Sequence, residues 1–179
     1  MKMQNKVEKF ALGGGCFWCT EAVFDLLKGV KKVTPGYAGG TTAEPSYEQV
    51  CGGTTGHAEV VLVEYDPEEV SMEKLLEVFF DSHDPTTPNR QGNDIGTQYR
   101  SIILYTSEDQ KARVDEFIDR IAGEYSQPVV TEVKALEKFY PAEDYHQRYF
   151  EKNPHQEYCQ LVISPKVEKI KKKLVGSDP

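Results

Sequence analysis

The chain has 179 residues, of which 39% are hydrophobic and 28% charged, and its formal net charge is −8. This length and composition predict one soluble globular domain, residues 1–179, with enough apolar side chains for a substantial core. The acidic balance argues against nucleic acid as a partner, since phosphate contacts need clustered lysines and arginines. The apolar runs of the sequence are shorter than a membrane-spanning helix, so we expect no membrane partner either.

The amino terminus and the cysteines indicate a location. The first nine residues are polar and lead into a short strand, so we expect no secretory or transit peptide. Four cysteines are too few for a secreted disulfide scaffold, and in a reducing cytosol such cysteines are more often catalytic or metal-bound. We therefore expect a cytoplasmic protein. The acidic surface without a long exposed apolar strand favours a monomer.

The first half of the chain predicts three strands and two helices. Residues 7–12 form a strand pattern that ends at three glycines, and residues 30–37 and 58–65 form two more. A helix that stops at Gly29 is predicted by apolar side chains at helical spacing, namely Ala22, Val23, Leu26 and Leu27. Ser71 is expected to cap a second helix with an apolar stripe of Leu75, Leu76, Phe79 and Phe80.

The second half predicts a long loop, a helix, two strands and a tail. Residues 84–98 lack periodicity, and a loop that long inside a compact domain is usually functional. Strands are expected at 99–105 and 129–135. Between them, Ser107 and Gln110 form a capping-box pattern ahead of the apolar positions Val114, Phe117, Ile118 and Ile121. Residues 137–158 are polar and aromatic, so we expect a long irregular C-terminal tail with only a short helix. This order of elements predicts an α+β fold, with helices packed on a mixed, mostly antiparallel sheet.

The seven residues from Gly13 to Cys19 are the most informative stretch of the sequence. Three glycines permit a tight turn, and they place Cys16 just before a predicted helix. Because a helix N-terminus carries unpaired N–H groups and partial positive charge, we expect a lowered pKa and a nucleophilic thiolate at Cys16. The alternative is a small buried thiol at a strand-to-helix turn.

The cysteines allow three interpretations. Cys16 and Cys19 have the C-x-x-C spacing of thioredoxin-like redox proteins, but the residues between them, Phe17 and Trp18, are bulky and apolar. A zinc site would need a second such pair, whereas Cys51 and Cys159 are single and far apart, so we expect no metal. In the third interpretation Cys16 is a nucleophile beside an apolar pocket of Phe17 and Trp18, and a distant cysteine is its disulfide partner.

Glu59 lies in the strand pattern of residues 58–65. Alternate residues of a strand share a face, so Glu59 is expected beside Val61 and Val63. A carboxyl group among apolar neighbours resists ionisation, which would raise its pKa and let it donate a proton near neutrality. The alternative is an exposed, solvated carboxylate at the end of the strand.

Three further polar residues are candidates for the same site. Asp94 and Tyr99 lie in and just after the long loop, and Tyr47 follows the glycine pair at 39–40. Each is also compatible with simple turn or core roles. A thiolate, a pocket for a methyl group and an acid that protonates oxygen together fit the reduction of a methyl sulfoxide.

The chain resembles the A-type peptide methionine sulfoxide reductases over nearly its whole length. Six strings in the order of that family carry the resemblance: GGCFW at 14–18, GYAGG at 36–40, GHAEV at 56–60, HDPT at 83–86, RQGNDIGTQYRS at 90–101 and YPAEDYHQ at 140–147. The family reduces methionine sulfoxide that has the S configuration at sulfur, both in proteins and as the free amino acid. It does so without a metal or a bound organic cofactor. The resemblance also implies a two-layer α+β sandwich.

The resemblance implies roles for the candidate residues. Cys16 would attack the sulfoxide sulfur and become a sulfenic acid, while Glu59 would protonate the oxygen. Tyr47 and Tyr99 would hydrogen-bond that oxygen, with Asp94 supporting the network. The aromatic pair Phe17 and Trp18 would hold the S-methyl group.

A second thiol would then form a disulfide that thioredoxin reduces. The family more often has glycine where this chain has Cys19, so the identity of the resolving thiol stays open. Cys159 is favoured, because members commonly carry the resolving thiol on the tail. Cys19 is close enough to Cys16 to compete or to relay the disulfide. A thioredoxin-like or metal-binding module remains the alternative function.

Overall fold

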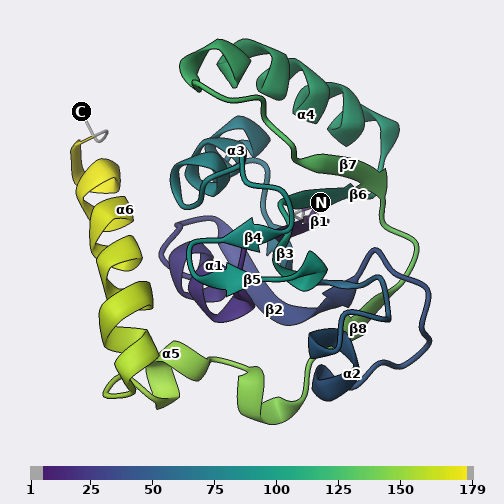
Figure 1. The fold of residues 1–179 in the computed structure, drawn as a ribbon. Helices are drawn as coiled ribbons and strands as arrows, with labels where there is room; N and C mark the ends of the chain where they lie inside the picture. Colours follow the sequence, from purple (N-terminus) through teal and green to yellow (C-terminus); the bar gives the residue numbers. More distant parts are fainter. Residues whose placement is uncertain (1–5, 177–179) are drawn as a thin grey trace, which may run out of the picture.

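A six-stranded sheet runs through the part of the chain that the computed structural model describes, residues 6–176 (Figure 1). In spatial order its strands are β7 (Glu132–Ala135), β6 (Ile102–Tyr105), β1 (Glu8–Gly13), β3 (Ala58–Tyr65), β2 (Val30–Ala38) and β8 (Phe139–Pro141). Neighbouring strands are antiparallel except β6 and β7, which are parallel. The predicted α+β class with a mixed, mostly antiparallel sheet is confirmed.

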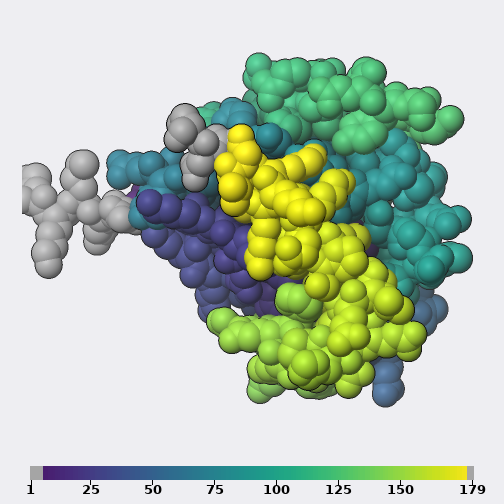
Figure 2. Space-filling model, turned by 90° about the vertical axis from the view of Figure 1, so that its left-hand side faces the viewer, coloured from purple at the N-terminus to yellow at the C-terminus, as the bar shows by residue number. Residues whose placement is uncertain are grey.

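The described residues also form α-helices. They are α1 (Phe17–Phe24), α2 (Tyr47–Cys51), α3 (Met72–Asp81), α4 (Glu108–Ile121), α5 (Tyr149–Lys152) and α6 (Ser164–Gly176). A π-helical turn, Cys159–Ile163, leads directly into α6. This C-terminal helix packs against α1 and lies across one side of the molecule (Figure 2).

The alternation of side chains along the strands separates two apolar clusters. Phe10 and Leu12 of β1 join the large cluster on the side of the helices, together with Val61 and Val63 of β3. The residue between the first two, Ala11, belongs to a smaller cluster on the other face, which Leu136 and Phe139 help to cover. Glu59 lies two residues before Val61, so it points to the same side of the sheet as α1.

The predicted helix starts are largely correct. Ser71 accepts a hydrogen bond from the backbone N–H of Lys74, as a cap should. Ser107 caps α4 in the same way through the N–H of Gln110. However, the Gln110 side chain accepts from the N–H of Thr106 instead of closing the reciprocal box on Ser107. The capping box predicted there is therefore only half formed.

The loop and the tail are more ordered than the sequence predicts. Residues 84–98 contain a small hairpin of β4 (Arg90–Gln91) and β5 (Asp94–Ile95). Within the expected irregular tail, β8 adds an edge strand to the sheet and α5 adds a helical turn. The tail prediction was wrong here because β8 is held by pairing with β2, a contact between residues about a hundred positions apart. No helix within residues 6–176 combines the length and apolar character needed to cross a membrane.

Candidate active site

The turn between β1 and α1 places Cys16 at the start of a helix. Gly15 has φ of 97°, a left-handed conformation that suits glycine, and it turns the chain into α1. Cys16 is the N-cap residue of α1, and its carbonyl accepts from the N–H of Cys19 at 3.1 Å. Only 9% of Cys16 is exposed, so its thiol is held in an almost enclosed site.

A side-chain hydrogen bond between Cys16 and Cys19 shifts the pKa of both thiols. Burial raises the pKa of Cys16, and its contacts with Cys19 and Glu59 raise it further. The hydrogen bond from Cys16 lowers the pKa of Cys19. The predicted lowered pKa of Cys16 is therefore wrong, because the helix N-terminus, acting through the Trp18 N–H, is outweighed by burial. Cys16 is therefore protonated in the resting protein, and Cys19 is the thiol of the pair that loses its proton more readily.

Glu59 lies beside the start of α1, at the first turn after the glycines. It is 2% exposed, and its Oε1 accepts from the N–H of Phe17 at 3.3 Å. The other oxygen, Oε2, is buried and has no hydrogen-bond partner within residues 6–176. Burial raises the pKa of Glu59 to about 8, so the carboxyl group is mostly protonated at neutral pH. The predicted apolar environment and raised pKa are confirmed.

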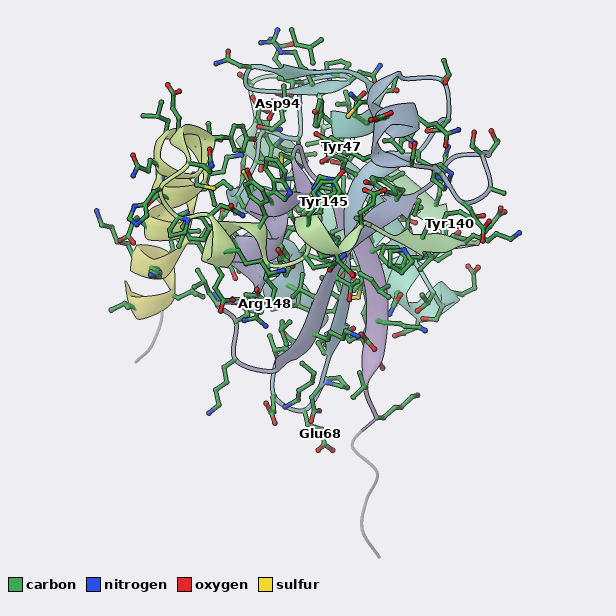
Figure 3. All side chains as sticks on the ribbon, turned by 90° about the horizontal axis from the view of Figure 1, so that it is seen from below. Tyr47, Glu68, Asp94, Tyr140, Tyr145 and Arg148 are labelled. Carbon is green, nitrogen blue, oxygen red and sulfur yellow. The ribbon has the colours of Figure 1, made fainter. Side chains whose placement is uncertain are left out.

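Tyr47, Asp94 and Tyr99 reach the same region from three separate elements. Tyr47 begins α2, Asp94 lies on β5, and Tyr99 ends the 3₁₀ turn Thr97–Tyr99. Burial raises the pKa of both tyrosines; the next largest cause is the hydrogen bond with Cys51 for Tyr47 and the charge of Glu59 for Tyr99. The charge of Asp94 in turn raises the pKa of Glu59. Figure 3 shows Tyr47 and Asp94 on the same side of the molecule. The fold thus gathers hydroxyl and carboxyl groups beside Cys16.

The two aromatic residues after Cys16 have different positions. Phe17 is 1% exposed, and its ring contacts those of Tyr37 and His146. Trp18 is only half-buried, and its ring lies parallel to that of Tyr149 with centroids 3.6 Å apart. The Trp18 ring can therefore meet a bound molecule, whereas the Phe17 ring supports the site from within.

Cys159 is not on an exposed tail. It starts the π-helical turn before α6 and is fully buried. Burial raises the pKa of its thiol, and the charge of Cys19 raises it further, which places Cys159 near Cys19. Cys19 therefore has Cys16 as its hydrogen-bond partner and Cys159 as a second neighbouring thiol. Cys51, in contrast, is exposed at the end of α2.

Several residues of the site have no role predicted from the sequence. The Tyr158 hydroxyl donates to Asp94 Oδ2 at 2.8 Å and lies 3.8 Å from the Cys19 sulfur. His146 accepts the indole N–H of Trp18 on Nδ1 at 3.1 Å. His146 lies inside the string at 140–147, which is the only signal in the sequence that could have pointed to it.

A buried pair of thiols at a helix N-terminus, next to a neutral carboxylic acid, defines a thiol-based oxidoreductase site. The family model described as peptide methionine sulfoxide reductase matches residues 8–178. A protein of Nautilia profundicola named peptide methionine sulfoxide reductase MsrA is 60% identical over 164 residues, 92% of this chain and 94% of that protein. The chain belongs to the peptide methionine sulfoxide reductase family. This membership favours the sulfoxide interpretation over a thioredoxin-like or metal-binding module.

Solved structures agree with the fold. Mxr1 from Saccharomyces cerevisiae in reduced form matches with a TM-score of 0.83 and 34% identity, over 89% of this chain and 92% of that chain. The structure of Mxr1 in complex with Trx2 matches with a TM-score of 0.59 and 22% identity, over 83% and 90% of the two chains. At that identity the second likeness shows the fold alone.

Proposed function

We propose that the protein reduces the S epimer of methionine sulfoxide, in oxidised proteins and as the free amino acid, to methionine. The observation that carries this proposal is the Glu59 carboxyl group, protonated at neutral pH and with Oε2 unpartnered, beside the thiol of Cys16. A sulfoxide oxygen that enters this site would meet a buried carboxyl oxygen that has no hydrogen-bond partner among the described residues. The methyl group would lie against the accessible Trp18 ring.

The first step transfers the sulfoxide oxygen to Cys16. The Cys16 sulfur attacks the sulfoxide sulfur while Glu59 donates its proton to the oxygen, whose negative charge Tyr47 and Tyr99 stabilise by hydrogen bonds. The bond formed between the two sulfur atoms then breaks as the hydroxyl group passes from the substrate sulfur to the Cys16 sulfur, so methionine leaves and Cys16 becomes a sulfenic acid. The thiol proton lost by Cys16 restores Glu59, so the step needs no further proton. Asp94 is proposed to support this network through its place beside Glu59.

The second step is proposed to use Cys19 rather than Cys159. The lowered pKa of Cys19 and the hydrogen bond that links it to Cys16 favour attack by Cys19 on the sulfur that becomes oxidised. Its attack forms the Cys16–Cys19 disulfide and releases the sulfenic oxygen as water. Cys159 would then attack Cys19, which frees Cys16 as a thiol and leaves a Cys19–Cys159 disulfide. In total, two thiols and one sulfoxide give one disulfide, methionine and water.

Thioredoxin is proposed as the reductant of this disulfide. Cys19 is 3% exposed and Cys159 is fully buried, so a protein reductant reaches them only after a local opening. The π-helical turn at 159–163 is the natural place for it, because such turns are less regular than the α-helix. Mxr1, which in its reduced form matches this chain at 34% identity, has also been solved in complex with Trx2, and this supports the same kind of partner here. We further propose that the chain acts as a monomer in the cytoplasm, where resting thiols stay reduced.

The activity is tested by reducing each epimer of methionine sulfoxide separately, first with dithiothreitol and then with thioredoxin. We expect the S epimer to be converted and the R epimer to react at least about a hundredfold more slowly, because only one places the methyl group on Trp18 with its oxygen on Glu59. Methionine is measured by chromatography. Equal rates for both epimers, or none for either, would contradict the proposal.

The order of the thiols is tested with serine variants and one molar equivalent of sulfoxide. We expect Cys19→Ser to accumulate the Cys16 sulfenic acid, which mass spectrometry detects after trapping with a carbon nucleophile. Cys159→Ser should still form the Cys16–Cys19 disulfide but lose most of its cycling with thioredoxin. Cys51→Ser is the matched control and should behave as the parent chain does. Accumulation of sulfenic acid in Cys159→Ser would instead make Cys159 the direct partner.

A further inference from the structure

The Trp18 ring is positioned by one short segment of the chain. His146 accepts its indole N–H at 3.1 Å, and the Tyr149 ring stacks on it with an interplanar angle of 7°. Both residues come from the segment 146–149, which crosses the amino-terminal end of α5 (Figure 1). Whatever fixes this segment therefore fixes Trp18.

The segment turns sharply at Arg148. This residue has φ of 56° and ψ of 38°, a left-handed conformation that costs a non-glycine residue about 1–2 kcal/mol. It is also the N-cap position of α5, where its side chain supplies no capping hydrogen bond. The guanidinium group instead points outward (Figure 3) and donates to Glu151 at 2.6 Å. The turn needs another group to satisfy its backbone.

Glu21 of α1 supplies that group. Its Oε2 accepts from the backbone N–H of Arg148 at 3.1 Å, and its carboxyl group is also hydrogen-bonded by the backbone N–H of Tyr149. Glu21 is 2% exposed and lies three residues after Trp18 on the same helix. One short helix thus carries both the ring and the carboxyl group that holds the segment packed on it.

The surroundings of Glu21 separate it from the redox chemistry. It borders a surface hollow of about 300 Å³ that Asp25, Arg148 and Lys171 also line. Burial raises the pKa of Glu21 to about 7, while Asp25 raises it and Arg148 lowers it by smaller amounts. Either ionisation state keeps an oxygen that can accept a backbone N–H. The hydrogen-bond partners of Glu21 are backbone groups, so Glu21 acts by fixing the position of the turn.

We infer that Glu21 is a positioning residue of the active site, which caps the turn into α5 and thereby holds Tyr149 and His146 against Trp18. The expected effect of Glu21 on substrate affinity rests on the proposed function, in which the Trp18 ring receives the S-methyl group. The expected effect of Glu21 on Trp18 does not depend on the proposed function, because Trp18 contacts His146 and Tyr149 in the resting protein.

Trp18 is the only tryptophan of the chain, so its fluorescence reports on this site alone. We expect Glu21→Leu, which keeps bulk but removes the acceptor, to shift Trp18 emission to longer wavelength and to increase its quenching by acrylamide. The KM for methionine sulfoxide should rise about tenfold, since a hydrogen bond to a charged group is lost, whereas the saturated single-turnover rate changes much less. Glu21→Gln keeps a carbonyl acceptor and should restore both the emission and the KM.

Asp25→Ala is the matched control, because Asp25 is the C-cap residue of the same helix and lines the same hollow without capping α5. It should leave Trp18 emission unchanged. Unchanged emission in Glu21→Leu would overturn the inference whatever the activity, and so would failure of Glu21→Gln to rescue a well-folded protein. A changed emission in a chain whose parent reduces neither epimer would instead contradict the proposed function and leave the capping role supported.

Discussion

Serine in place of Cys16 is expected to abolish sulfoxide reduction with every reductant, including dithiothreitol. A hydroxyl group is a far weaker nucleophile toward sulfur and cannot form a sulfenic acid, so the loss should be at least about a thousandfold. The measurement is methionine formed from the S epimer in single-turnover and multiple-turnover assays. Because the Cys16 thiol is buried and neutral at rest, the variant should fold normally.

The matched comparison is Cys19→Ser with dithiothreitol. A small thiol can reach the Cys16 sulfenic acid in place of Cys19, so this variant should keep turning over while Cys16→Ser does not. If Cys16→Ser retained activity with dithiothreitol and Cys19→Ser lost it, the nucleophile would have to be reassigned to Cys19. That outcome is chemically meaningful here, because Cys19 has the lower pKa of the two thiols.

Much of the fold follows from local patterns in the sequence. The strand β3 was predicted with its observed bounds, because a short apolar run rich in valine is bounded by Gly56 before it and Asp66 after it. Ser71 and Ser107 marked helix starts, since a cap is a contact between residues three positions apart. A short helix was expected in the tail, and α5 lies there. The edge strand β8 was missed, because strand pairing with residues distant in sequence stabilises it.

Some residues of the candidate site could likewise be predicted from local sequence, and others could not. Glu59 could be predicted from its strand, because burial is the main cause of the raised pKa of its carboxyl group. The pKa of Cys16 could not, because it depends on how deeply α1 is covered and on a hydrogen bond with Cys19. Glu21 and Tyr158 gave no local signal, since their partners lie more than sixty residues away along the chain. A sequence therefore predicts the groups whose surroundings are set by neighbouring residues, and it misses those whose partners are distant along the chain.

Glutamine in place of Glu59 is expected to slow sulfoxide reduction by about a hundredfold to ten-thousandfold, the usual contribution of a positioned acid. The amide keeps the size and the acceptor for the Phe17 N–H but cannot donate the proton that the leaving oxygen needs. In the parent chain the rate of the first step should be steady at low pH and fall as pH rises past about 8, because the acid form of Glu59 is lost there. In Glu59→Gln this decline should disappear. Single-turnover rates between pH 5 and 10 test both statements.

Stability provides the independent check on that result. A carboxyl group whose pKa is raised to about 8 on folding binds its proton in the native state at pH values where the unfolded chain has lost it. The free energy of unfolding should therefore decrease as pH rises from the ordinary glutamate pKa to about 8, and Glu59→Gln should escape this loss by on the order of 1–3 kcal/mol at pH 7. Glu64→Gln, the same change on the opposite face of β3, should alter neither the rate nor the stability. If the Glu59→Gln protein is slower but melts at a higher temperature than the parent, the loss of rate is due to the missing proton donor. If it is slower and melts at a lower temperature, Glu59 has a structural role instead.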